Sequence, residues 1–172
     1  MKRCDAMVDV GRRRFLKGGA VAAAGAAAAS ALMGPARAQN AARVAYPSNR
    51  LANVADLKLN EPVDVAYPDA DAPGVLLKLG AAVPGGAGPE GDIVGFTTIC
   101  PHKGFPLAYN ADDRTFNCPG HYSRFDPEKG GQQIWGQATQ NLPQYTLRID
   151  DKGDIYAEGV DELLYGRLSN VL

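Results

Sequence analysis

Metal-binding residues are scarce in this chain, and their scarcity is informative. The 172 residues include two histidines, three cysteines and one tryptophan, and we find no internal repeat. Beyond residue 40 the chain also lacks the long helical periodicity of a helix bundle, while 20 glycines and 12 prolines favour short strands and frequent turns. After the first 38 residues, the remainder is long enough for one hydrophobic core and too short for two.

Basic stretches are absent from the main part of the chain. Residues 1–38 contain seven Lys/Arg and two Asp, whereas residues 39–172 contain eleven Lys/Arg and seventeen Asp/Glu, a net charge of −6. An acidic body without a basic stripe argues against nucleic-acid binding.

The first 38 residues have the order of an export signal. Residues 11–17 read Gly-Arg-Arg-Arg-Phe-Leu-Lys, an alanine-rich run follows, and residues 36–38 are Ala-Arg-Ala, which suits a signal peptidase. The Arg-Arg-x-Phe-Leu-Lys order resembles a twin-arginine signal. We expect residues 1–38 to be a twin-arginine signal peptide, residues 39–172 to be the folded domain, and the protein to be periplasmic. The run could also remain as an uncleaved anchor, but its low hydrophobicity favours cleavage.

Short alternating or β-branched stretches predict an all-β domain. We expect strands near residues 51–59, 63–67, 75–79, 93–99 and 115–117, a loop at 80–91, and a hairpin formed by 145–149 and 155–157. The strands at 93–99 and 115–117 lead directly into Cys100 and Cys118. Ile134 and Trp135 are expected to pack beneath the segments that follow these strands.

Both histidines and two of the three cysteines fall in two short loops. Residues 100–102 read Cys-Pro-His and residues 118–121 read Cys-Pro-Gly-His, with fifteen residues, 103–117, between them. The third cysteine, Cys4, lies in the predicted signal peptide. Every soft-metal ligand of the expected domain therefore belongs to one pair of loops.

Three kinds of chemistry are compatible with two Cys and two His. Two cysteines in an exported protein commonly form a disulfide, but a disulfide gives the neighbouring histidines no role. A tetrahedral zinc ion accepts the same ligands, although structural zinc sites commonly pair Cys with Cys and His with His along the chain. In a two-iron, two-sulfide cluster, the cysteines can bind one iron and the histidines the other. Ligand type alone leaves zinc open.

The pattern Cys-x-His, followed after fifteen residues by Cys-x-x-His, resembles the Rieske iron–sulfur family. This resemblance implies a Rieske-type antiparallel β-sandwich with a small cluster-binding subdomain of two loops. It also implies one [2Fe–2S] cluster per chain, with Cys100, His102, Cys118 and His121 as ligands. Because two neutral imidazoles replace two thiolates, such clusters have reduction potentials of about −150 to +300 mV, against about −400 mV with four cysteines. The chain would then be an electron carrier.

Two positions depart from the Rieske subunits of cytochrome bc complexes. Those subunits carry one further cysteine in each loop, joined as a disulfide, where this chain has Phe105 and Gly120. We expect Phe105 to cover the cluster in the volume of the missing bridge. The family's serine, whose hydroxyl donates to a bridging sulfide, is present as Ser123, whereas Phe125 replaces a tyrosine donor. Since fewer donors lower the potential, we expect a value below the bc-complex proteins and above the four-cysteine class.

Within the family, the chain resembles the small subunit of arsenite oxidases. The shared features are the twin-arginine leader, the domain length, and residues 118–123 and 136–143. The resemblance implies a heterodimer with a large molybdopterin-containing subunit that oxidises arsenite and passes electrons to this cluster. A soluble cytochrome c or copper protein would be the electron acceptor. The chain would be an oxidoreductase subunit without a substrate site, and we assign no catalytic residue to it.

Two other roles remain as alternatives. The Rieske subunit of a quinol-oxidising cytochrome bc complex needs a durable membrane anchor and usually has the disulfide. A Rieske ferredoxin that serves a ring-hydroxylating oxygenase lacks the disulfide, but it is cytoplasmic, and the export signal counts against it.

Overall fold

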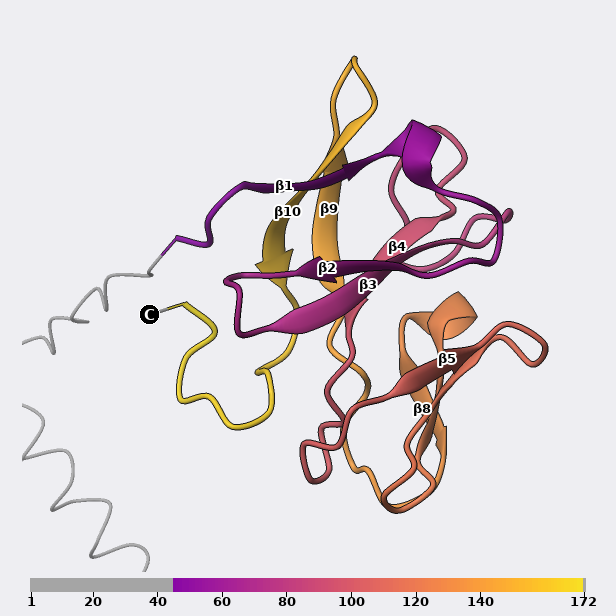
Figure 1. The fold of residues 1–172 in the computed structure, drawn as a ribbon, viewed down its shortest axis with the longest axis vertical. Coiled ribbons are helices and arrows are strands. Elements are labelled where there is room, and N and C mark those ends of the chain that lie inside the picture. The colour runs from indigo at the N-terminus through magenta and orange to yellow at the C-terminus, as the bar shows by residue number, and fades with distance from the viewer. Residues whose placement is uncertain (1–44, 172) are drawn as a thin grey trace, which may run out of the picture. The chain divides into compact units, whose positions relative to one another are not determined.

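The computed structural model describes residues 45–171, which form two three-stranded sheets and one four-stranded sheet (Figure 1). The predicted signal peptide, Cys4 and the first residues of the expected domain lie outside the described residues. Within the described part, no helix is both long enough and apolar enough to cross a membrane.

The first two sheets form an antiparallel sandwich. One has the strand order β1-β10-β9, and the other has the order β2-β3-β4. Their bounds are β1 Asn49–Asn53, β2 Val63–Ala66, β3 Pro73–Lys78, β4 Ile93–Thr97, β9 Tyr145–Ile149 and β10 Asp154–Val160. Ala52, Leu76, Ile93 and Ile155 belong to a core that joins the two sheets. The all-β prediction is confirmed.

Strands β3 and β4 of the second sheet are buried on both faces. Leu76 packs in the core shared with the first sheet, whereas Val75 and Leu77 pack in a second core that includes Cys100 and Cys118. Successive side chains of a strand point to opposite faces, so a strand covered on both sides needs consecutive apolar residues. The unbroken apolar run in β3 therefore places the cysteines directly against the sandwich.

The third sheet forms a separate small subdomain, below the sandwich in Figure 1. Its order is β5-β6-β7-β8, with β5 Ala108–Asn110, β6 Thr115–Asn117, β7 Arg124–Asp126 and β8 Gln132–Trp135. Two short 3-10 helices, η1 Val54–Asp56 and η2 Pro127–Lys129, follow β1 and β7. The loop between β6 and β7 contains the second Cys-His pair, and the first pair lies between β4 and β5.

Two local predictions are wrong. The strand expected at 51–59 ends at Asn53, because the Asn53 side chain accepts the Ala55 N–H and Asp56 accepts the Asn53 N–H, which turns the chain into η1. Ile134 and Trp135 do not pack beneath the loops: β8 is an edge strand, and the Trp135 side chain is 68% exposed.

The chain after β10 folds back and is fastened by polar contacts. We call residues 161–171 the C-terminal strap. Arg167 binds Asp69 through two hydrogen bonds of 2.5 and 2.8 Å, and these bonds lower the pKa of Asp69. The buried Asn170 side chain accepts the Leu164 N–H and donates to the Glu162 carbonyl. The strap is thus an ordered part of the domain.

Candidate metal centre

The two cysteine loops have the same backbone hydrogen bonds. In each loop, the cysteine N–H donates to the carbonyl five residues later, from Cys100 to Phe105 over 2.8 Å and from Cys118 to Ser123 over 2.9 Å. These bonds close two turns of equal length, although histidine is the second residue after one cysteine and the third after the other. Because the Cys-to-His spacing differs between the loops, the equal length of the two turns cannot be recognised in the sequence.

The fourth residue after each cysteine completes the match. The N–H groups of Gly104 and Tyr122 donate to the carbonyls of Cys100 and Cys118, over 2.9 and 3.1 Å. Both residues have left-handed backbone conformations, with φ of +70° and +61°. Glycine adopts this conformation readily, whereas a tyrosine does so at a cost. Tyr122 is therefore held in place by the loop around it.

The cysteine side chains lie together in the core. Cys100 is 1% exposed and Cys118 is 3% exposed, and both are free thiols. Burial raises the pKa of Cys100, and the neighbouring Cys118 raises it further, while the backbone N–H of His102 acts in the opposite direction. Two adjacent buried thiolates need a compensating positive charge, which a bound metal centre provides.

The histidines form a second pair at the edge of the site. Their ring centroids are 4.8 Å apart at an interplanar angle of 74°, with His121 exposed and His102 half-buried. The Nδ1 atom of His102 is buried and has no hydrogen-bond partner among the described residues. Since an unpaired buried nitrogen costs free energy, a metal bond at this atom would remove that cost.

A [2Fe–2S] cluster fits these four residues. The structure provides a buried thiol pair and an imidazole pair beside solvent, which is the division of ligands that two irons require. Cys100 and Cys118 would hold one iron, and His102 and His121 the other. The bound cluster would supply one-electron redox chemistry, and the exposed imidazole of His121 would face its redox partners.

Phe105 and Gly120 are in contact, at the two positions where bc-complex proteins have their extra cysteines. A Cβ atom added to Gly120 would lie 2.8 Å from Cγ of Phe105. The Phe105 ring also lies edge-on to His121, with 5.8 Å between ring centroids. The aromatic ring thus links the two loops at this place without a covalent bond.

Ser123 is fully buried behind the second loop. Its Oγ accepts the N–H groups of Gln137 and Ala138, over 3.1 and 3.0 Å. A hydroxyl has two acceptor lone pairs and one proton, so both lone pairs are occupied and the proton is left to donate. Among residues 45–171 the hydroxyl donates no hydrogen bond, so it would be available to a cluster sulfide. Phe125, also fully buried, has no hydroxyl to offer.

One polar network beside the site could not be predicted from the sequence. Arg124 in β7 donates to Asp113 over 2.5 Å, to the Asn117 side chain over 3.0 Å and to the Thr115 hydroxyl over 3.1 Å. The hydrogen bond from Thr115 and the nearby Arg124 charge lower the pKa of Asp113. These contacts join β6 to β7, the strands on either side of the second loop. Asp113 therefore has a structural role, which its position in a predicted turn did not reveal.

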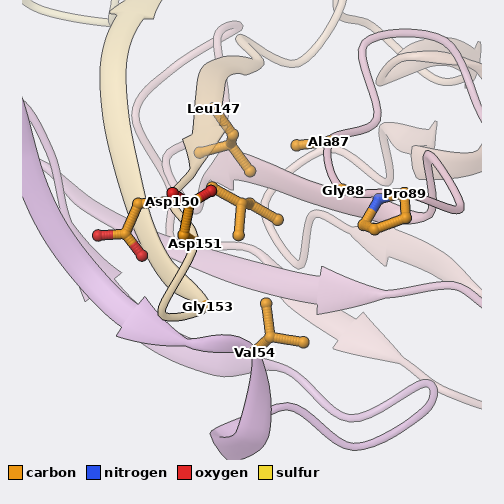
Figure 2. Close-up of a pocket in the computed structure, with 9 residues that line it drawn as sticks. Val54, Ala87, Gly88, Pro89, Leu147, Asp150, Asp151 and Gly153 are labelled. Atoms are coloured by element: carbon orange, nitrogen blue, oxygen red, sulfur yellow. The ribbon is translucent and has the colours of Figure 1, made fainter.

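Two surface hollows differ in their relation to the site. A hollow of about 470 Å³ is lined by His121, Tyr122, Gln133, Trp135, Gly136 and Gln137. A hollow of about 650 Å³ lies at the β9–β10 turn and the 87–89 loop, and Figure 2 shows its lining. Asp150 at its rim accepts the N–H groups of Lys152 and Asp154, which stabilises the turn. This larger hollow has no Cys or His in its lining.

The fold and the paired ligands agree with a comparison against protein families. Residues 48–146 match the Rieske [2Fe-2S] domain, and the chain belongs to this family. It therefore carries a Rieske-type [2Fe–2S] cluster and is an electron-transfer protein. The sequence-based prediction of family, fold and cofactor is confirmed.

Two relatives of the chain are both iodate reductase subunits. The chain is 42% identical over 128 residues to iodate reductase subunit IdrB of Denitromonas iodatirespirans, covering 73% of this chain and 69% of that protein. It is 40% identical over 158 residues to iodate reductase subunit IdrB of Pseudomonas sp. (strain SCT), covering 90% and 81%. These relatives support an oxidoreductase subunit. The more specific assignment to arsenite oxidase stays a prediction.

A solved structure supports the same fold. The soluble domain of the Rieske protein II (soxF) from Sulfolobus acidocaldarius is 25% identical, with a TM-score of 0.60, and the match covers 67% of this chain and 78% of that chain.

Proposed function

We propose that this chain is the electron-transfer subunit of a periplasmic oxidoreductase whose large molybdopterin-containing subunit acts on a small inorganic oxoanion. The observation that carries this proposal is the match to iodate reductase subunits, which extends over 90% of the chain and so beyond the Rieske domain itself. A common partner subunit would explain similarity that extends beyond the common domain.

The site supports a carrier of electrons. The thiol pair is buried and the imidazole pair borders solvent, so the histidine side is the short route for an electron to enter or leave. Cys100, His102, Cys118 and His121 are proposed as the ligands. Ser123 is proposed to donate a hydrogen bond to a cluster sulfide. Substrate chemistry belongs to the large subunit in this proposal.

The identity of the oxoanion decides the direction of electron flow. Iodate reduction consumes electrons, so the cluster would pass them to the large subunit. Arsenite oxidation releases electrons, so the cluster would receive them and pass them to a soluble cytochrome c or copper protein. The identity to the iodate reductase subunits favours the first direction, and the resemblance of residues 118–123 and 136–143 to arsenite oxidase subunits favours the second.

A periplasmic location follows from the predicted twin-arginine signal. Residues 1–38 lie outside the described part, and the proposal therefore rests on their sequence. N-terminal sequencing of the native protein tests it: a start near residue 39 supports cleavage, and a start at Met1 in the membrane fraction indicates an uncleaved anchor.

The function is tested with the complex purified through an affinity tag on this chain. We expect molybdenum and iron to co-purify, and the reduced cluster, followed by electron paramagnetic resonance, to be oxidised when iodate is added. Reduction of the oxidised cluster by arsenite would instead support the arsenite oxidase assignment. A cluster that responds to neither oxoanion, or a complex without molybdenum, would refute the proposal. The isolated chain, which keeps its cluster but lacks the large subunit, is the control for direct reaction of the reagents with the cluster.

A further inference from the structure

Most exposed large apolar side chains lie in the two cysteine loops (the cluster loops), in β8 and in the C-terminal strap. Among the described residues, eight such side chains are exposed, and all except Leu59 belong to the cluster loops, to β8 or to the C-terminal strap. The strap supplies three of them, Leu163, Tyr165 and Leu168, and the Leu168 side chain is completely exposed. Exposed apolar side chains in such numbers are a feature of protein interfaces.

The strap presents these side chains in a fixed arrangement. Arg167 is held by its two hydrogen bonds to Asp69, and Leu164 is buried in the sandwich core. Asn170 donates to the Tyr46 hydroxyl and also bonds to Leu164 and Glu162 within the strap. A surface that is already ordered loses little conformational entropy when a partner binds. The side chains of Leu163 and Leu168 are exposed and do not pack in the core of the domain, so their burial by a partner would be favourable.

The strap also touches the first cluster loop. The Tyr165 ring lies against Gly104, where an added Cβ atom would be 2.4 Å from Cε1 of the ring. Gly104 is two residues after His102. A second contact, from the Gln140 side chain to the Leu163 carbonyl over 3.3 Å, joins the strap to the segment after β8. A protein bound to the strap would therefore lie beside the imidazole pair.

The charge of the strap fits a permanent partner. Its only cation, Arg167, is paired with Asp69, and Asp161 accepts the Gln144 N–H, which leaves Glu162 as its one carboxylate without such a partner among the described residues. Permanent interfaces are apolar and poor in charge at their centre, whereas transient redox encounters are commonly steered by charge. The strap also lies outside residues 48–146, the part of the chain that matches the Rieske domain.

We propose that the C-terminal strap is the docking surface for the large catalytic subunit, with Leu163 and Leu168 buried in the interface and Tyr165 placing that subunit beside the histidine pair. The inference rests on the proposed function, because it takes the catalytic subunit of that complex as the partner.

The test compares three tagged forms of the full chain, expressed in cells that make the complex. These forms are the wild type, the double variant Leu163→Glu/Leu168→Glu, and the control Leu59→Glu, whose side chain is 58% exposed outside the strap. The readout is the molybdenum-to-iron ratio of the purified material. We expect the double variant to lose at least about tenfold in associated molybdenum subunit, because two buried charges weaken an apolar interface strongly, and the control to match the wild type.

Control variants and alternative outcomes distinguish a failure of this inference from a failure of the proposed function. The visible spectrum of the cluster should be the same in all three forms, and a Leu163→Met/Leu168→Met variant should retain the molybdenum subunit because it keeps the apolar surface. A double Glu variant that keeps the wild-type molybdenum-to-iron ratio would overturn this inference but would not affect the proposed function. A double Glu variant that keeps this ratio but changes the mass of the isolated chain would show that the strap pairs two copies of this chain, and would also overturn it. A wild-type preparation without molybdenum would instead refute the proposed function.

Discussion

A disulfide placed between residues 105 and 120 should stabilise the protein. The Cγ atom of Phe105 occupies the place that Sγ takes in a cysteine, and it is 2.8 Å from the Cβ position of Gly120. The two Cβ atoms are thus close enough for the range of about 3.5–4.5 Å found in disulfides. In the double variant Phe105→Cys/Gly120→Cys, the bridge would close a loop of about fifteen residues, which corresponds to about 3 kcal/mol in the chain-entropy model.

Comparison of the oxidised and reduced forms of one variant isolates this effect, because both forms lack the Phe105 ring. We expect the oxidised form to melt about 5–15 °C higher, and a thiol titration to find no additional reactive cysteine in it. The single variants Phe105→Cys and Gly120→Cys are the controls, and their melting temperatures should not depend on the redox state of the added thiol. Equal melting temperatures for the two forms of a fully bridged double variant would refute the view that the loops rely on non-covalent packing.

Four further results are expected. Tyr122→Gly should raise the free energy of unfolding by up to about 1 kcal/mol in chemical denaturation, because glycine removes the cost of the left-handed backbone; a decrease would contradict this. Gly136→Ala should destabilise by more than about 2 kcal/mol, since the new Cβ would lie 2.4 Å from Cα of Ser123, whereas Gly166→Ala, also at positive φ but with open space around it, should cost about 1 kcal/mol. Ser123→Ala should lower the reduction potential by about 60 mV in protein-film voltammetry, the equivalent of one hydrogen bond of about 1.4 kcal/mol to a charged acceptor; an unchanged potential would exclude that bond. Burial raises the pKa of Tyr67 to about 12, so the unfolded chain, with an ordinary pKa of about 10, ionises first and stability falls between pH 10 and 12; Tyr67→Phe should show a smaller fall in alkaline unfolding curves.

The sequence predicted the sandwich better than the subdomain. Strands such as 63–66, 93–97 and 145–149 are readable because their side chains alternate or are uniformly apolar according to the faces they bury. The strands β7 and β8 have only three or four residues, and their register shifts at a bulge between Arg124 and Phe125. A polar edge strand of this length has no periodicity to detect, which is also why Trp135 was placed inside although it is exposed.

The candidate ligand residues stand out in the sequence because Cys and His are rare in it, whereas the contacts that support them depend on the fold. The two Cys-His pairs can be identified from the sequence alone. The contacts of Arg124 with Asp113, and of Arg167 with Asp69, exist only once distant segments are placed side by side. The position of Ser123 could be predicted from the family resemblance, but the two backbone N–H groups that direct its hydroxyl come from residues fourteen and fifteen positions later.

The two cysteine loops are closed by the same two backbone hydrogen bonds, and we call each such hydrogen-bonded turn a frame. The two frames are therefore structurally equivalent. Each frame fixes a cysteine at its start and a left-handed residue at its fifth position, while the histidine occupies the third place in one frame and the fourth in the other. Ligand spacing can therefore change within a frame without altering the hydrogen bonds that close it. A histidine could move by one place, or a cysteine could replace it, while the fold around the loop stays the same. Evolution could in this way convert one class of two-iron site into another by point substitution, and a designer could follow the same route.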